Sequence, residues 1–218
     1  MALTIEQSKS GDYYLVIHSG SRNLGKQVAE IYQRRAINLH RGWDEYILRR
    51  NEVIKEYKEL GNSKEINHAL EELKEGYGIL DIPEDLCWLY GEALTDYLHD
   101  IEICQKYAMR NRELIASMIM GKASLTEIDS FHTIHNYIDI NEMILRKGAI
   151  RAVKGEKVLI PMNMKDGSIL GIGKGNREWN YSAPHGAGRI LSRKQAKEII
   201  DIKEYEKSME GIYTTSFL

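Results

Sequence analysis

Cysteine and long apolar runs are both scarce in this sequence. The 218 residues include two cysteines, Cys87 and Cys104, which lack the CxxC spacing of a zinc site. So few thiols exclude a disulfide framework and favour a reducing compartment, and we therefore expect a cytoplasmic protein. No uninterrupted apolar run approaches the roughly 20 residues that a membrane span requires. Residues 1–11 also lack the basic start and apolar core of a signal peptide, so we expect no membrane partner.

The sequence also lacks a large excess of charge of either sign. The chain has 30 basic and 32 acidic residues, for a net charge of -2. This balance excludes a strongly basic nucleic-acid coat, although a local basic groove remains possible. The chain is long enough to bury a core without disulfides. We find no internal repeat, low-complexity tract or linker, and we expect a single domain over residues 1–218.

The spacing of apolar residues changes twice along the chain. Residues 13–19 form a short run rich in β-forming residues, which predicts a buried strand with His18 at its C-terminal end. Asn23 then predicts the N-cap of a helix. Residues 43 to about 120 have a helical pattern, and short runs between glycines predict strands after it. This order predicts a mixed α+β domain with short strands around a site and a long helical insertion.

Two interruptions divide the helical portion. They fall near residues 59–65 and residues 78–85. Pro83 suits the first turn of a helix, so we expect the longest helix to begin near Asp85.

Histidines lie at the ends of several predicted strands. His18 begins the sequence HSGSR, which combines backbone N–H groups, hydroxyls and Arg22 in a pattern suited to an oxyanion. His132 and His135 are three residues apart, which in a strand places them on opposite faces. Only one of them is then expected to face a site.

The sequence HGAGR, residues 185–189, forms a second candidate anion site. Gly186 and Gly188 permit positive φ, which would turn successive N–H groups toward an anion. Pro184 restricts the backbone before His185. We therefore expect a stiff platform under an imidazole that is exposed on its other side.

Each of these features also has a purely structural interpretation. A lone histidine at a strand end is usually packed or solvated, and methionines are commonly core fillers. The GxGxG run at residues 171–175 lacks the acidic residue of a dinucleotide fold and suits a turn. On these grounds we expect solvated His40, His68 and His99, core-filling Met162 and Met164, and buried Cys87 and Cys104.

Five segments in this order carry a family resemblance: VIHSGSRNLGKQVAEIYQ, HNYI, RKGAIRA, IPMNMKDGS and SAPHGAGRILSR. The chain resembles the RtcB family of GTP-dependent RNA ligases. The resemblance implies an enzyme of RNA repair or tRNA splicing, which joins an RNA 3′-phosphate or 2′,3′-cyclic phosphate to a 5′-hydroxyl. It also implies a histidine-GMP intermediate, GTP as co-substrate and Mn²⁺ as cofactor.

The resemblance assigns roles to individual residues. His185 would accept the GMP, and His18 and His135 would be metal ligands. The nucleotide contacts would be Asn136, Pro161, Met162, Asn163, Met164, Ser168, Gly186, Ala187 and Gly188. Planar guanidinium groups pair bidentately with phosphate, so we expect RNA phosphates at Arg22, Arg189 and Arg193.

Some of the family's motifs have no counterpart in this sequence. A DxGxGxxC-like stretch with acidic and cysteine ligands, a GGGNHF segment, a DEAP-like turn and a terminal lysine are all missing. We therefore expect an internal or C-terminal part of the catalytic domain, which depends on a complementing segment for the missing ligands. Two other functions stay open: a non-catalytic RNA- or nucleotide-binding module, and a metal-dependent phosphoesterase.

Overall fold

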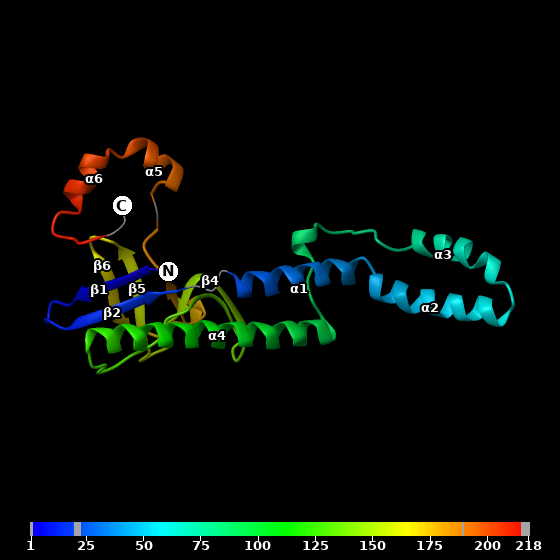
Figure 1. The fold of residues 1–218 in the computed structure, drawn as a ribbon, viewed down its shortest axis with the longest axis horizontal. Helices are drawn as coiled ribbons and strands as arrows, with labels where there is room; N and C mark the ends of the chain where they lie inside the picture. The colour runs from blue at the N-terminus through cyan, green and yellow to red at the C-terminus, as the bar shows by residue number, and fades with distance from the viewer. Residues whose placement is uncertain (1, 20–22, 189, 215–218) are drawn as a thin grey trace. The chain divides into compact units, whose positions relative to one another are not determined.

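The strands and most of the helices lie in different parts of the chain (Figure 1). The structure is a computed structural model that describes residues 2–19, 23–188 and 190–214. It divides into two compact units, one made of Met1–Ser19 and Met109–Leu218 and the other of Gly20–Ala108. All the described strands belong to the first unit. The mixed α+β fold is confirmed.

The first unit contains three small sheets in which every neighbouring pair is antiparallel. β1 (Ala2–Gln7) pairs with β2 (Tyr13–His18), and β5 (Lys157–Asn163) pairs with β6 (Gly167–Ile172). The third sheet has the order β3-β4-β7, with β3 (His135–Asp139), β4 (Ile144–Arg151) and β7 (Ser182–Pro184). Antiparallel pairing fits an α+β fold and excludes a βαβ unit within these sheets.

The first hairpin differs from the sequence prediction in two ways. β1 was not predicted, and β2 is half-buried instead of buried. In a two-stranded sheet each strand has only one neighbouring strand, so its side chains are only partly covered. This explains the partial burial. The predicted end of the strand at His18 is confirmed.

A small apolar core lies directly beneath the ends of β3 and β7. Ile150, Ala152 and Val158 are buried, and Ile160 and Ala183 pack against them. In the ladders, Ile150 is opposite His135 of β3 and pairs with Ala183 of β7. The core therefore anchors the strand ends that bear histidines.

A buried arginine joins the three strands of the same sheet. Arg146 in β4 is 2% exposed. It donates to Asp139 at 2.9 Å, to Glu142 at 3.1 Å, to the Tyr137 hydroxyl at 3.2 Å and to Ser182 Oγ at 3.0 Å. A buried guanidinium requires such partners, because unpaired charge is costly in the interior. The arginine thus holds β3, β4 and β7 together.

The second unit consists of helices. α1 (Leu24–His40), α2 (Trp43–Glu59) and α3 (Ile66–Glu75) precede α4 (Gly91–Ala123), which runs on into the first unit. α2 ends before Gly61, which has a φ of 74° and provides the left-handed residue typical of a helix C-terminus. The interruption predicted near residues 59–65 is confirmed.

Two predictions about helix starts are wrong in detail. α4 begins at Gly91, not near Asp85, because Pro83 instead precedes a short 3₁₀ turn and Cys87 is extended. The side chain of Asn23 makes no cap hydrogen bond and accepts one from Gln27.

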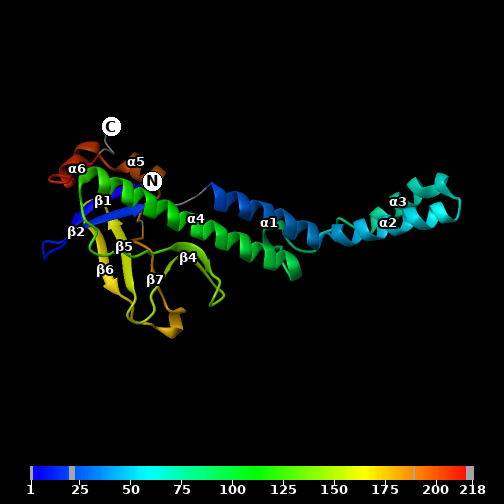
Figure 2. The ribbon, with the colours of Figure 1, turned by 60° about the horizontal axis from the view of Figure 1, so that its bottom comes forward.

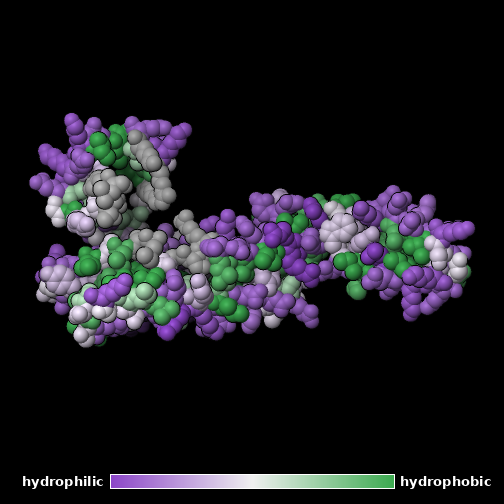
Figure 3. All heavy atoms as spheres, viewed as in Figure 1, coloured by the Kyte–Doolittle hydropathy of each residue, from purple (hydrophilic) through white to green (hydrophobic). Residues whose placement is uncertain are grey.

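His40 contradicts the expectation of a solvated side chain. Its ring is 4.1 Å from the Trp88 ring between centroids, and its Nε2 is 3.2 Å from the Trp88 carbonyl oxygen. His68 and His99 are exposed, and Cys87 and Cys104 are buried, as predicted. Many large apolar side chains remain at the surface among charged ones (Figure 3).

The described chain ends in two short helices in the first unit. α5 (Arg193–Ile199) begins with a capping box formed by Ser192 and Gln195, and α6 (Ile202–Ser208) is capped by Asp201. No helix in the described ranges is long and apolar enough to cross a membrane.

Candidate functional site: a histidine centre

Three imidazoles from distant parts of the chain meet in the first unit. The Nε2 atoms of His18 and His135 are 3.4 Å apart. The ring centroids of His135 and His185 are 4.8 Å apart. His18 ends β2, His135 begins β3, and His185 directly follows β7. The predicted convergence of these three residues is confirmed, and we call them the histidine centre.

The first two histidines have the spacing of a metal-binding pair. Two nitrogen ligands at about 2.1 Å from one tetrahedral ion lie about 3.4 Å apart. The distance between the Nε2 atoms of His18 and His135 has this value. No group of three or more His, Cys, Asp and Glu side chains suited to a metal occurs among residues 2–19, 23–188 and 190–214. The residues present fit a cation as two of its ligands.

His185 is an exposed residue, and one of its ring nitrogens makes a hydrogen bond. Its Nδ1 is 2.7 Å from the carbonyl oxygen of Gly148. A carbonyl only accepts hydrogen bonds, so Nδ1 carries the proton in the neutral ring. Nε2 then keeps its lone pair, as a nucleophile or a ligand requires.

The turn after His185 differs from the predicted anion nest. Neither Gly186 nor Gly188 has positive φ. A Cβ on Gly186 would lie 3.0 Å from the Pro161 carbonyl oxygen, and the Ala187 N–H donates to that same oxygen at 3.2 Å. Glycine at position 186 therefore permits close approach to β5, and the Ala187 N–H is engaged within the protein.

The other predicted nucleotide contacts divide into two groups. Asn136 directly follows His135 in β3, and its Oδ1 accepts from the Gly148 N–H at 2.7 Å. Asn163 and Ser168 are at the β5–β6 turn. The side chain of Asn163 closes that turn by accepting from two backbone N–H groups, and the Ser168 hydroxyl donates to Glu6 at 3.0 Å.

Met162 and Met164 are not core fillers. They are 36% and 45% exposed. The expectation that these two methionines fill the core is wrong: they lie at the end of β5 and in the turn after it, and Met164 Sδ accepts from the Thr214 hydroxyl at 3.9 Å. The GxGxG run was predicted to suit a turn; Gly175 has a φ of 70°, and Gly173 passes so close to the Val153 carbonyl oxygen that a Cβ there would overlap it.

The predicted phosphate-binding arginines are only partly described. Arg22 and Arg189 lie outside the described residues. The backbone of Arg193 begins α5, and its side chain lies outside the described part.

The sequence interpretation missed two residues that hold the chain after His18. Asn111 of α4 donates to Ser19 Oγ at 3.2 Å, and Arg112 donates to the Ser19 carbonyl at 3.4 Å. The C-terminal half of α4 lies alongside the sheets (Figure 2). The signal in the sequence is the polar RNR triplet within an otherwise amphipathic helix. These contacts fix the backbone immediately beyond His18.

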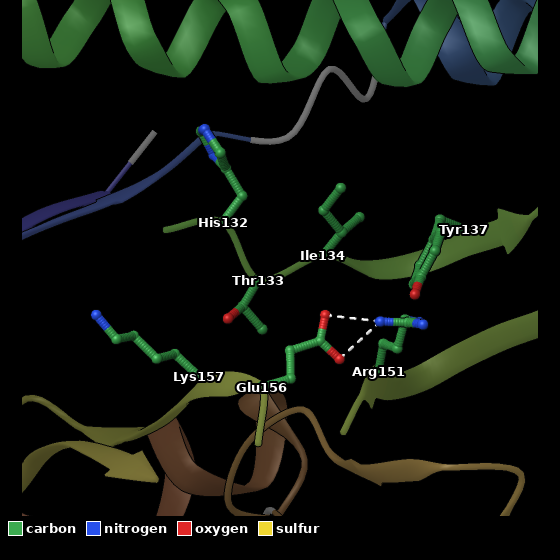
Figure 4. A pocket seen from close by; sticks show the side chains of 7 residues that line it. All are labelled: His132, Thr133, Ile134, Tyr137, Arg151, Glu156 and Lys157. Atoms are coloured by element: carbon green, nitrogen blue, oxygen red, sulfur yellow. Dashed lines mark hydrogen bonds and ion pairs between the residues drawn. The ribbon is translucent and has the colours of Figure 1, made fainter. Parts of the chain in front are cut away.

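His132 lies outside the histidine centre. It precedes β3 instead of alternating within it, and its Nε2 is 3.6 Å from a carboxylate oxygen of Glu113. It lines a cavity of about 160 Å³ in which Arg151 donates to both oxygens of Glu156, each at 2.9 Å (Figure 4). The remaining lining residues are Thr133, Ile134, Tyr137 and Lys157. Arg151 and Glu156 pair with each other across this cavity, whereas His132 and Lys157 pair with Glu113 and Asp129, which do not line it.

Small antiparallel sheets whose ends bring three imidazoles together define an α+β protein with a histidine-centred site. The profile of one family, described as tRNA-splicing ligase RtcB, matches residues 2–216. The chain belongs to this family.

Curated relatives support the same assignment. The chain is 25% identical over 214 residues to the RNA-splicing ligase RtcB of Escherichia coli K12, which covers 90% of this chain and 44% of the relative. It is 26% identical over 239 residues to the tRNA-splicing ligase RtcB of Aeropyrum pernix, covering 93% of this chain and 43% of the relative. The chain therefore spans less than half the length of these relatives. No solved structure matches the chain.

Proposed function

We propose that this chain is part of a GTP-dependent RNA ligase, which joins RNA 3′-phosphate or 2′,3′-cyclic phosphate ends to 5′-hydroxyl ends. The observation that carries the proposal is the convergence of His18, His135 and His185 in a member of the RtcB family. Family membership favours the ligase over a non-catalytic binding module and over a phosphoesterase. We place its action in the cytoplasm, in RNA repair or tRNA splicing.

His185 is the proposed nucleophile. Its Nε2 lone pair attacks the α-phosphorus of GTP, so that an N–P bond forms, the bond to the β-phosphate oxygen breaks and pyrophosphate leaves. Nδ1 stays protonated and donates a hydrogen bond to the Gly148 carbonyl oxygen. This hydrogen bond stabilises the positive charge that develops on the ring.

The RNA then takes the guanylyl group. An oxygen of its 3′-phosphate attacks the same phosphorus, the N–P bond breaks, and His185 returns to the neutral imidazole. The RNA 5′-hydroxyl next attacks the activated 3′-phosphate, its proton passes to water, and the bond to the GMP phosphate oxygen breaks so that GMP leaves. A 2′,3′-cyclic phosphate end is first opened by water to the 3′-phosphate. Splitting the reaction in this way replaces one difficult displacement with easier ones.

His18 and His135 are the proposed ligands of a manganese ion. Such an ion would neutralise charge on the α-phosphate and on the leaving pyrophosphate when it is bound. The two imidazoles supply neutral nitrogen donors beside His185. Nitrogen donors alone also suit zinc, so the preference for manganese is proposed from the family.

The remaining contacts complete the proposal. The Met162 and Met164 side chains are exposed, and the Pro161 carbonyl joins the end of β5 to the turn after His185, so we propose GTP contacts along this edge. Arg22, Arg189 and Arg193 are proposed to bind RNA phosphates. A complementing segment is proposed to provide further metal ligands.

Guanylylation of His185 tests this function directly. We expect little or no labelled GMP on the chain alone with Mn²⁺ and α-labelled GTP, because two protein ligands hold the ion loosely and a displacement of about 1 Å can cost about a hundredfold in rate. In a chimera where this chain replaces the matching segment of the Escherichia coli relative, we expect acid-labile label and ligation of RNA ends.

The matched control is His185→Gln in the same chimera, which should remove both signals. A folded chimera that hydrolyses GTP or RNA phosphate without labelling would contradict the ligase. Robust labelling of the chain alone would show that no complementing segment is needed.

A further inference from the structure

We propose that Asn136 is a positioning residue that sets the tautomer of His185 through the Gly148 carbonyl. The catalytic role of Asn136 rests on the proposed function, whereas its effect on the tautomer of His185 does not. Three residues on three different segments take part: Asn136 in β3, Gly148 in β4, and His185 after β7.

A bulge in β4 creates the arrangement. His135 is opposite Ile150 and Tyr137 is opposite Arg146. One residue of β3, Asn136, is therefore opposite three residues of β4, 147–149. A bulge redirects the backbone of the longer strand and is often found next to active sites. Here it turns the backbone around Gly148 out of the regular ladder, so that its carbonyl oxygen contacts the imidazole of His185.

Two contacts hold the backbone of Gly148: the side chain of Asn136 and the backbone N–H of His185, which donates to the Gly148 carbonyl oxygen at 3.4 Å. Asn136 Oδ1 accepts from the Gly148 N–H at 2.7 Å, and the Gly148 carbonyl oxygen lies 2.7 Å from His185 Nδ1. Both Asn136 and Gly148 are left-handed, with φ of 57° and 68°. Asparagine and glycine are the residues that tolerate this conformation, which explains why these types occupy the two positions.

The hydrogen bond decides which nitrogen of His185 is reactive. With the proton held on Nδ1, the lone pair lies on Nε2, the nitrogen on the other side of the ring. If Gly148 moved, Nδ1 would lose its acceptor and the ring could carry its proton on Nε2, which would then no longer be nucleophilic. Asn136 Oδ1 accepts from the Gly148 N–H, and its amide NH₂ supplies the donor for a nucleotide.

The test is the tautomer of His185 in the whole chain without GTP or metal, read from imidazole ¹⁵N shifts at a pH where the ring is neutral. His185→Gln identifies the signal. We expect the Nδ1–H tautomer in the wild-type chain. Asn136→Gly removes the acceptor and suits the positive φ, and it should shift the tautomer ratio toward Nε2–H by about threefold to tenfold, the worth of one hydrogen bond.

Asn136→Asp is the matched control. It keeps an acceptor oxygen for the Gly148 N–H and should retain the wild-type tautomer, although it removes the NH₂ donor. In the chimera, Asn136→Asp should chiefly raise the GTP concentration needed for half-maximal labelling. Asn136→Gly should also lower the maximal labelling rate.

The inference is overturned if the wild-type ring carries its proton on Nε2, or if Asn136→Gly leaves the tautomer unchanged while the signals of Ile150 and Ala183 show an intact sheet. If the glycine variant unfolds, Asn136→Ala, which also lacks the acceptor for the Gly148 N–H, decides the role of Asn136 by the same reading. The expected tautomers together with a chimera that is never labelled would contradict the proposed function and leave the positioning role standing.

Discussion

At the scale of residues, the proposed chemistry of this chain rests on three imidazoles that lie close together but have different contacts. His185 has Nδ1 on a carbonyl oxygen, whereas His18 and His135 bring their Nε2 atoms to 3.4 Å from each other. The two Nε2 atoms lie at hydrogen-bonding distance, with the donor set by the tautomers of the rings. The proposed Mn²⁺ ion would replace this contact, because two nitrogen ligands of one tetrahedral ion have about the same spacing.

We therefore predict that His18→Ala and His135→Ala each weaken Mn²⁺ binding by at least about tenfold. Even residues that only orient a metal ligand contribute that much. The measurement is the loss of the electron paramagnetic resonance signal of free Mn²⁺ on titration with protein. His132→Ala is the control, because His132 contacts Glu113 outside the histidine centre. Weaker binding in a folded His132→Ala variant, with no change in the other two, would contradict the assignment.

At the scale of elements, the short strand β7 is held in place by side-chain hydrogen bonds as well as by its ladder. It pairs with β4 over only three residues. Arg146 adds a hydrogen bond to Ser182 Oγ and another to the Asn180 carbonyl, both at the start of β7. Because His185 directly follows β7, the position of the imidazole depends on this arginine.

We predict that Arg146→Met lowers the free energy of unfolding by about 3–5 kcal/mol, because it leaves the carboxylate of Asp139 buried without its main partner. Urea unfolding followed by circular dichroism measures the change. Arg151→Met is the matched comparison. Arg151 pairs with Glu156 and Glu142 but its side chain is 37% exposed, so its loss should cost about 1 kcal/mol or less. Equal losses in the two variants would show that burial does not set the importance of Arg146.

At the scale of the whole molecule, ion pairs lower the pKa of carboxyl groups along much of the chain. Hydrogen bonds from Arg146 and Arg151 lower the pKa of Glu142 below its ordinary value of 4.5. Other basic partners lower the pKa of Glu102, Glu113 and Asp129. In each case the unfolded chain binds a proton more readily than the folded one over the interval between the two pKa values.

We predict that the free energy of unfolding is steady above pH 5 and falls as the pH drops below about 4.5, the ordinary pKa of glutamate. The stabilisation by these carboxylates is present above their ordinary pKa values and is lost as the pH falls through the lowered ones. Chemical unfolding at a series of pH values measures the slope. Glu142→Gln should lower stability at pH 7 and flatten the slope in acid. Stability that rises on acidification would contradict the sign of these pKa changes.

Much of the local structure was predictable from short stretches of sequence. The strand that ends on His18 and the interruption at residues 59–65 follow from residue types with strong local preferences. Predictions failed where a distant contact decided the outcome. The need for glycine at position 186 comes from the nearby Pro161 carbonyl oxygen instead of from a positive φ. His40 packs on Trp88, which is 48 residues away along the chain.

The sequence by itself determined the α+β class and the family, because periodicity and motifs are local properties of a chain. Only the tertiary structure decided which atoms meet. The distance between His18 and His135, the partner of His185 Nδ1 and the burial of Arg146 all depend on strand register and on the bulge opposite Asn136. Register is set by packing across the sheet, where one shifted residue changes every contact.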